Sequence, residues 1–335
     1  MAITLDLTLV LLIAAAASAG LIAMLRPLLR RYAVAQPNAR SSHVAPTPQG
    51  GGIAVVAATI VAVLAGAAIG TPTPILALWP LAGTVLLLAV TGACDDILHL
   101  AVAPRFLAQF IAVGIVLAML PPDARLVPLL PWWIERAVLL IAGVYAVNVV
   151  NFMDGLDWMT AAEVVPVTAG LWILALLGAV ASPDATVAVA LLGAILGFAP
   201  FNRPVAKLFL GDVGSLPVGL LLFWLLVRLA VGGHLAAAIL LPLYYVADAT
   251  VTLAQRLARG ENVLRAHRTH FYQRATDRGF SVGNIVTRVF VVNVELAALA
   301  AASVVASAPW MQIAALALGA ATVGGLLAQF ARGKR

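Results

Sequence analysis

A short polar stretch, NVVNFMDGLDWM at residues 148–159, interrupts an apolar run and could hold a metal ion. Asn148 and Asn151 are three residues apart and therefore share one face of a helix, which ends at the Asp154-Gly155 pair. Amide and carboxylate oxygens that converge at a helix end are hard ligands, which suit Mg²⁺ better than a soft metal. The alternative interpretation is a helix C-cap followed by an Asp-Gly turn.

Two other stretches carry carboxylates. GACDDILHL, residues 92–100, contains the adjacent Asp95 and Asp96, which repel each other unless a proton or a cation is shared. FLGDVGSLPVG, residues 209–219, places Asp212 between glycines, close to the positive end of the apolar helix that follows. Each stretch alone could be a solvated helix end or a turn with an N-cap.

A basic stretch, ENVLRAHRTHFYQRA at residues 261–275, gathers Arg265, His267, Arg268 and His270. Clustered Arg and His donors bind phosphate through charge-assisted and bidentate hydrogen bonds. The alternative is an ordinary basic membrane loop, although such a loop requires only Lys and Arg. The His-x-x-His spacing could also bind a transition metal, but no third ligand is evident.

Glycines and one lone carboxylate add two further candidates. Gly50 and Gly51, in RSSHVAPTPQGGGIA, allow either close packing of helices or close approach to a ligand. Asp248 lies inside a hydrophobic segment, where an ionisable residue usually faces the bundle interior and has a partner. Arg256 is a candidate partner, and the sequence does not show what Asp248 does.

The elements that must position these residues are membrane helices. Hydrophobic residues make up 63% of the 335 residues and charged residues only 10%, too few to cover a soluble surface of this size. Apolar runs of about 20 residues recur, each long enough to cross a bilayer. We expect an all-α, polytopic bundle of about 10–11 transmembrane helices. The candidate spans lie near 6–28, 50–70, 75–93, 105–120, 133–150, 160–180, 185–200, 214–231, 234–255, 283–306 and 311–330.

The distribution of basic residues predicts the orientation. Sixteen of the 20 Lys and Arg residues fall in alternate connections and the C-terminal tail. The positive-inside rule makes that side cytoplasmic, with the N-terminus outside and the C-terminus inside. We expect a single membrane domain, 1–335, whose cytoplasmic loops lie at about 29–49, 94–104, 151–159, 201–213 and 256–282. This topology explains the net charge of +6 without nucleic-acid binding.

All the polar stretches fall on that one side. Carboxylates that hold Mg²⁺ beside Arg and His donors are the groups that phosphoryl transfer requires. Their place at the membrane surface implies one soluble anionic substrate and one substrate that resides in the bilayer.

Five stretches of the chain resemble, in the same order, the motifs of a known family. They are SSHVAPTPQGGG, DD at 95–96, NVVNFMDGLD, FLGDVGS and HRTHFYQ. The chain is similar, over roughly residues 35–290, to the polyprenyl-phosphate N-acetylhexosamine-1-phosphate transferases. The last motif lacks the three consecutive histidines of the peptidoglycan translocase, and the first lacks its lysine. Both differences favour the branch that initiates O-antigen.

The resemblance implies a role for each motif. Asn151 and Asp212 would bind Mg²⁺, with Mn²⁺ as the alternative ion. The implied catalytic residues are Asp95, Asp96, Asp212, His267 and His270. Asp95 and Asp96 would position or activate the lipid phosphate. The substrate-binding candidates are Asp154, Asp157 and Arg268 from the resemblance, joined by Asn148, Arg265, Gly50 and Gly51 from the residues themselves.

The implied reaction joins a UDP-N-acetylhexosamine, UDP-GlcNAc or a related sugar, to undecaprenyl phosphate and releases UMP. It would start O-antigen or another cell-envelope polysaccharide at the cytoplasmic face of a bacterial inner membrane, among membrane lipids. A homodimer is one oligomeric state that the protein could adopt. One alternative is the phospho-MurNAc-pentapeptide translocase of peptidoglycan synthesis. Another is a secondary transporter, which should show inverted repeats and polar groups at the bilayer midplane. The sequence shows neither of these features.

Overall fold

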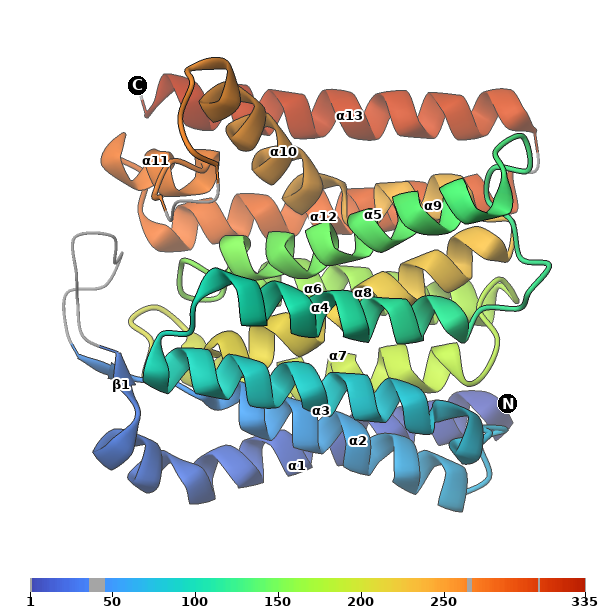
Figure 1. Ribbon diagram of the computed structural model, residues 1–335, viewed down its shortest axis with the longest axis horizontal. Coiled ribbons are helices and arrows are strands. Elements are labelled where there is room, and N and C mark those ends of the chain that lie inside the picture. The colour runs from blue at the N-terminus through green and yellow to red at the C-terminus, as the bar shows by residue number, and fades with distance from the viewer. Residues whose placement is uncertain (1, 36–45, 264–266, 307, 335) are drawn as a thin grey trace.

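The computed structural model describes residues 2–35, 46–263, 267–306 and 308–334. Within them the chain forms thirteen helices and one pair of two-residue strands (Figure 1). The elements are α1 (Ala2–Tyr32), β1 (Val34–Ala35), β2 (Thr47–Pro48), α2 (Gly51–Ala68), α3 (Ile75–Leu98), α4 (Val102–Ala118), α5 (Trp132–Met153), α6 (Met159–Leu176), α7 (Asp184–Asn202), α8 (Asp212–Val231), α9 (Leu235–Leu240), α10 (Leu243–Ala258), α11 (Phe271–Asp277), α12 (Val282–Val305) and α13 (Pro309–Arg332).

Nine helices of the described chain are long and apolar enough to cross a membrane, which confirms the predicted polytopic helical fold. They are α1, α2, α3, α5, α6, α7, α8, α12 and α13; α4 is a shorter apolar helix of 17 residues. The span expected at 234–255 is instead divided into α9 and α10 at Leu241 and Pro242. Proline has no N–H to donate and disfavours a continuous helix, and α10 runs oblique to its neighbours (Figure 1).

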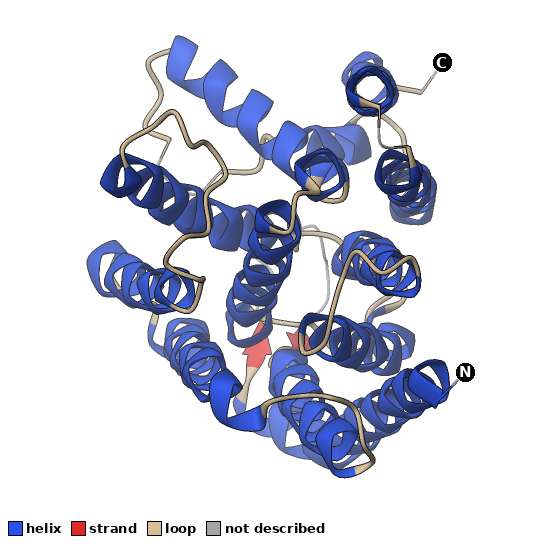
Figure 2. Ribbon diagram, turned by 90° about the vertical axis from the view of Figure 1, so that its right-hand side faces the viewer, coloured by secondary structure: helices blue, strands red, loops and turns tan. Residues whose placement is uncertain are grey.

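The most buried helix of the bundle is α8. In an 18-residue stretch of α8, 89% of the residues are buried, compared with 28% in α1. α8 packs against α3 and α5, whereas α1 packs against α2 and α7 at the periphery. Viewed along the helices, most axes run roughly parallel (Figure 2). Any residue at the first turn of α8 is therefore surrounded by several other helices.

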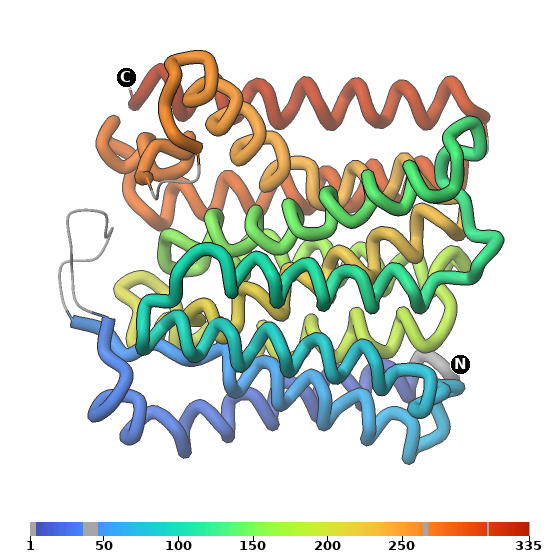
Figure 3. The backbone as a smooth tube through the Cα atoms, in the orientation of Figure 1, coloured from blue at the N-terminus to red at the C-terminus, as the bar shows by residue number. Residues whose placement is uncertain are grey.

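The N- and C-termini lie at opposite ends of the bundle (Figure 3). The loops after α1, α3, α5, α7 and α10 consequently reach the same end as the C-terminus, which we call the polar end. These connections carry the predicted motifs. The short strands β1 and β2 pair there, and Gln49 forms a parallel bridge with Phe209, which joins the first loop to the loop before α8.

Candidate active site

Asp96, near the end of α3, holds the first turn of α8. Its Oδ1 accepts a hydrogen bond from the backbone N–H of Asp212 at 3.0 Å, and its Oδ2 accepts one from Val213 at 3.1 Å. The first N–H groups of a helix have no partner within the helix, and a carboxylate satisfies them and stabilises the positive helix end. Asp96 thereby fixes the backbone on which Asp212 stands.

Glycines allow the backbones around Asp212 to come very close. Gly51 and Gly52 donate their N–H groups to the carbonyls of Phe209 at 2.9 Å and Leu210 at 2.8 Å. A Cβ atom on Gly52 would lie 2.2 Å from Cα of Gly214, so no larger residue fits there. The structure thus gives Gly51 and Gly52 a packing role. Substrate binding by Gly50 and Gly51 stays a prediction.

A polar cleft of about 290 Å³ opens at this end of the bundle. Asp95 is buried at its wall, accepts the N–H of Leu100 at 2.8 Å and forms an ion pair with Arg105. Three carboxylates in one cleft repel one another, so such a site favours a bound cation. The residues that line the cleft are Gln49, Asp95, Asp96, His99, Leu100, Arg105 and Asp212.

Asn151, at the end of α5, meets Asp212 directly. Its Nδ2 donates to Oδ1 of Asp212 at 2.7 Å and to Oγ of Ser215 at 2.9 Å. Asn148 lies one turn deeper, where it is buried and its Nδ2 donates to Oε1 of Gln109 in α4 at 2.6 Å. Two amides on one helix therefore have different surroundings: Asn151 belongs to the carboxylate cluster, and Asn148 joins α5 to α4.

Hydrogen bonds to Asp154 and Asp157 fix the loop between α5 and α6. Asp154 accepts a hydrogen bond from the Thr160 hydroxyl, and Asp157 accepts the N–H of Ala206 at 2.9 Å. Burial raises the pKa of Asp154 to about 7, and the hydrogen bond from Thr160 opposes this shift. Trp158 adopts a left-handed backbone conformation, with φ of 65°, and its N–H donates to Oδ1 of Asn202 at 2.8 Å.

The basic motif lies against the residues that follow Asn151. The rings of His267 and His270 are stacked with their centroids 4.9 Å apart, and the ring of Phe152 lies 6.1 Å from that of His270. The hydroxyl of Tyr272 donates to the carbonyl of Phe152 at 2.8 Å. The histidines are thus adjacent to the end of α5, although they are not among the residues that line the cleft.

Arg268 is engaged within its own segment. Its guanidinium lies 3.3 Å from Asp277 and donates to the hydroxyl of Thr276 at 2.9 Å, while its Nε is buried without a hydrogen-bond partner. Arg265 lies outside the described residues. His99 and Arg105, which also line the cleft, were not predicted as site residues.

The donor set suits a hard cation that is shared with a substrate. The described chain contains no group of three or more His, Cys, Asp or Glu side chains arranged to hold a metal ion. Mg²⁺ does not require one, because it usually retains several waters and binds through one or two carboxylates plus the phosphates of a substrate. Asp212 with the amide of Asn151 fits that pattern.

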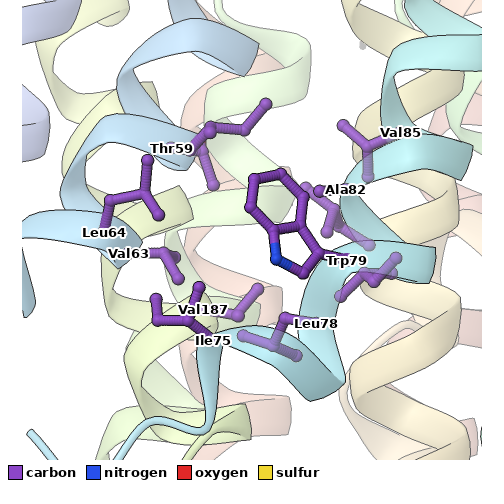
Figure 4. Close-up of a pocket in the computed structure, with 12 residues that line it drawn as sticks. Thr59, Val63, Leu64, Ile75, Leu78, Trp79, Ala82, Val85 and Val187 are labelled. Carbon is purple, nitrogen blue, oxygen red and sulfur yellow. The ribbon is translucent and has the colours of Figure 1, made fainter. Parts of the chain in front are cut away.

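A second pocket, of about 70 Å³, is apolar and opens between α2 and α3 around the indole of Trp79 (Figure 4). Its one polar lining residue, Thr59, has its hydroxyl bonded to the carbonyl of Val55 at 2.8 Å. Val85, at one edge of this pocket, is ten residues from Asp95, or about 15 Å along α3. This pocket is therefore separate from the carboxylate cleft and has no charged lining residue to bind an anion.

A family model and several known proteins match this chain. Residues 78–230, which include Asp95, Asn151 and Asp212, match the family model described as glycosyl transferase family 4. The chain is 28% identical to the decaprenyl-phosphate N-acetylglucosaminephosphotransferase of Mycobacterium tuberculosis, over 89% of this chain and 81% of that protein. The enzyme of the same name from Mycobacterium leprae is also 28% identical, over 89% and 83%.

A relative with a different substrate in its name also matches. The phospho-N-acetylmuramoyl-pentapeptide-transferase of Chlamydia trachomatis is 32% identical, over 52% of this chain and 59% of that protein. The similarity to this relative therefore covers about half of the chain, whereas that to the mycobacterial proteins covers most of it.

Proposed function

We propose that this chain transfers N-acetylhexosamine 1-phosphate from a UDP-sugar to undecaprenyl phosphate. It would do so as a member of the polyprenyl-phosphate N-acetylhexosamine-1-phosphate transferases of glycosyl transferase family 4. UMP is the second product. The observation that carries the proposal is the 2.7 Å hydrogen bond between Asn151 and Asp212. It lies at the polar end of the bundle, where Asp95, Asp96 and Asp212 line one cleft. The reaction would start O-antigen or another cell-envelope polysaccharide on the cytoplasmic face of the inner membrane.

We propose a role for each group. Asp212 and Asn151 would hold Mg²⁺, with Mn²⁺ as the alternative, and the ion would supply positive charge to the phosphates of the UDP-sugar. His267, His270 and Arg268 would bind those phosphates from the side of α11. Asp154 and Asp157, in the loop that contacts α11, would orient the nucleotide.

The lipid phosphate would enter the cleft lined by Asp95 and Arg105. One of its oxygens forms a bond to the sugar-bearing phosphorus, and the bond from that phosphorus to the oxygen of the departing UMP breaks. A phosphate monoester is largely deprotonated near neutral pH, with a second pKa of about 6, so the attack requires no strong base. Asp95 would accordingly position the acceptor through its ion pair with Arg105.

The similarity to the Chlamydia enzyme supports a second candidate, transfer of a phospho-MurNAc-pentapeptide. The HRTHFYQ motif, with one residue between Arg268 and His270, resembles the motif of family members that use the simpler N-acetylhexosamine donors, which supports the first candidate. Donor competition separates the two candidates, and comparison of undecaprenyl with decaprenyl phosphate tests the acceptor named for the mycobacterial relatives.

The deciding experiment uses the full chain, purified in detergent, with labelled UDP-GlcNAc, UDP-FucNAc or UDP-MurNAc-pentapeptide. We expect Mg²⁺-dependent labelling of undecaprenyl phosphate with one UMP released per lipid labelled, and loss of labelling with EDTA. Labelling by the pentapeptide donor alone would establish the second candidate. Uptake of label into proteoliposomes without lipid labelling would instead indicate a transporter and overturn the proposal.

A further inference from the structure

Asp248, in the middle of α10, is a fully buried carboxylate that the proposed reaction does not use. It accepts hydrogen bonds from the backbone N–H groups of Phe271 at 2.9 Å and Tyr272 at 3.1 Å. The hydroxyls of Tyr244 and Thr252 also donate to it, each at 3.3 Å. Its hydrogen bonds thus run from α10 to the first turn of α11, directly after His270.

The same carboxylate faces the side chain of His270. Oδ1 of Asp248 lies 3.3 Å from Nδ1 of His270, within ion-pair distance, and that buried nitrogen forms no hydrogen bond with any described residue. The His270 side chain is only 2% exposed, so its ring has little freedom to turn away. When a carboxylate faces one ring nitrogen of a histidine, the proton on that nitrogen is fixed and the other nitrogen is left for a ligand.

Aromatic groups hold the plane of the ring from its other sides. His267 stacks on His270 at 4.9 Å, and the rings of Tyr272 and Phe152 lie at 5.9 Å and 6.1 Å. These contacts place three titratable groups against the ring: Asp248 from α10, Tyr272 from α11 and His267 from the preceding loop. Burial, reinforced by the charge of Asp248, raises the pKa of Tyr272, which keeps that phenol neutral.

We infer that Asp248 is a positioning residue for the donor phosphates: it holds His270 with Nδ1–H directed at its own carboxylate. The imidazole then presents Nε2 to its surroundings, and the protonated ring can donate Nε2–H to a phosphate oxygen. The role is exerted through His270, because Asp248 itself is fully buried. This inference rests on the proposed function and assigns Asp248 to recognition of the UDP-sugar rather than of the lipid.

A double-mutant cycle tests whether Asp248 acts through His270. We expect Asp248→Asn to lower kcat/KM for the UDP-sugar about 10- to 100-fold, as loss of an orienting partner does elsewhere. KM for the lipid phosphate should not change. In the His270→Gln background the same change should cost less than about twofold, because two residues that act as one unit are not additive. An equal loss in both backgrounds, or equal effects on both substrates, would overturn the inference.

Glu163→Gln is the matched control. Glu163 is another buried carboxylate, in α6, and it accepts a hydrogen bond from Asn293 at 2.6 Å rather than contacting the basic motif. If replacement of any buried carboxyl group were sufficient, this variant would impair the use of the UDP-sugar as strongly as Asp248→Asn. We expect its KM for the UDP-sugar to match that of the wild type.

A second readout does not depend on turnover. The chain contains five histidines, so ¹⁵N spectra of histidine-labelled wild type and of His270→Gln identify the His270 ring. We expect Nδ1 of His270 to carry a proton in the wild type and to lose that preference in Asp248→Asn. A wild-type ring that is protonated only at Nε2 would overturn the inference even if Asp248→Asn did not fold. An inactive wild type with the expected spectrum would instead overturn the proposed reaction alone.

Discussion

Asn151 and Asp212 are 61 positions apart in the chain and share a 2.7 Å hydrogen bond. Both come from the ends of helices, so their side chains are held by backbone that is already fixed by the bundle. In the proposed reaction this pair would hold a divalent ion beside the cleft that Asp95 and Asp96 line. At the scale of single residues, this contact is the centre of the site.

Removing the carboxylate of Asp212 should therefore abolish the reaction. We expect Asp212→Ala to lower lipid labelling by at least about 100-fold, the scale at which loss of one key electrostatic group acts. Asp123→Ala, at an exposed position in the loop between α4 and α5, is the control and should retain normal turnover. Near-normal labelling by a folded Asp212→Ala variant would count against the metal assignment.

Asp154 should make stability depend on pH. Its pKa is about 7 in the fold and near 3.8 as a free side chain, so the folded state binds the proton more tightly. The raised pKa shows that the fold favours the neutral carboxyl group. The unfolding free energy of the protein should therefore fall as the pH rises from the free pKa of Asp154 to its pKa in the fold. Asp154→Asn removes the ionisation and should flatten the decline by about 1 kcal/mol or more.

The measurement is thermal unfolding in detergent without divalent ions, between about pH 5 and pH 8. Asp157→Asn, in the same loop, is the comparison variant. An unchanged pH dependence in Asp154→Asn would mean that Asp154 is ionised throughout this range.

At the scale of elements, the site depends on how closely the first turns of α2 and α8 approach. Gly52 and Gly214 are in backbone contact, and the carboxylate of Asp96 bonds two N–H groups of α8 from the side of α3. Three helices are thereby fixed around Asp212. The sequence marked the glycines as either packing residues or ligand-binding residues, and the distances show the packing.

Gly52→Ala should separate these helices. The added Cβ would lie 2.2 Å from Cα of Gly214, and a backbone atom cannot rotate away as a side chain can. We expect a loss of about 1–3 kcal/mol in stability, the usual cost of overpacking, together with loss of lipid labelling. Gly83→Ala, also in a membrane helix but with nothing within 4 Å of the added atom, should be neutral. Thermal unfolding of both variants checks this, and equal stability would disprove the close contact.

The sequence predicted the membrane helices and the meeting of the polar motifs for a simple physical reason. A span must be apolar for about 20 residues, so polar groups can gather only at its ends. The division of α9 from α10 was not predicted, because apolar composition continues across Pro242 and hides the break. The burial of Asn148 against Gln109 was not predicted either, since helical spacing places Asn148 on nearly the same face as Asn151 but not at the same depth.

Partners that come from distant elements were the least accessible to the sequence. Arg256 was the candidate partner for Asp248 because it lies two turns along the same helix. The hydrogen bonds of Asp248 instead go to the first turn of α11, and Arg256 bonds Glu261 at 2.8 Å. His99 and Arg105 likewise line the cleft only because α3 and α4 fold back on each other after Leu98.

At the scale of the whole molecule, the proposed reaction requires the polar end to face the cytoplasm, where sugar nucleotides are made. Basic side chains are concentrated at that end, while Arg125, Arg136 and Arg228 belong to the opposite end. Arg125 and Arg228 are paired there with the carboxylates of Glu135 and Asp184, at 2.7 Å and 2.9 Å. The positive-inside rule counts Lys and Arg residues, and the polar end carries most of them. The rule therefore predicts that the polar end faces the cytoplasm.

Cysteine labelling in intact cells tests that orientation. The one native cysteine, Cys94, is replaced by Ser, and a single new cysteine is placed at the exposed Asp123 or at the exposed Arg259. A membrane-impermeant maleimide should label Asp123→Cys from outside, because the loop between α4 and α5 lies at the end opposite the polar end. It should label Arg259→Cys only after the membrane is opened. The reverse pattern would place the carboxylate cleft outside, away from UDP-sugars, and a transferase that uses them could not work in that orientation.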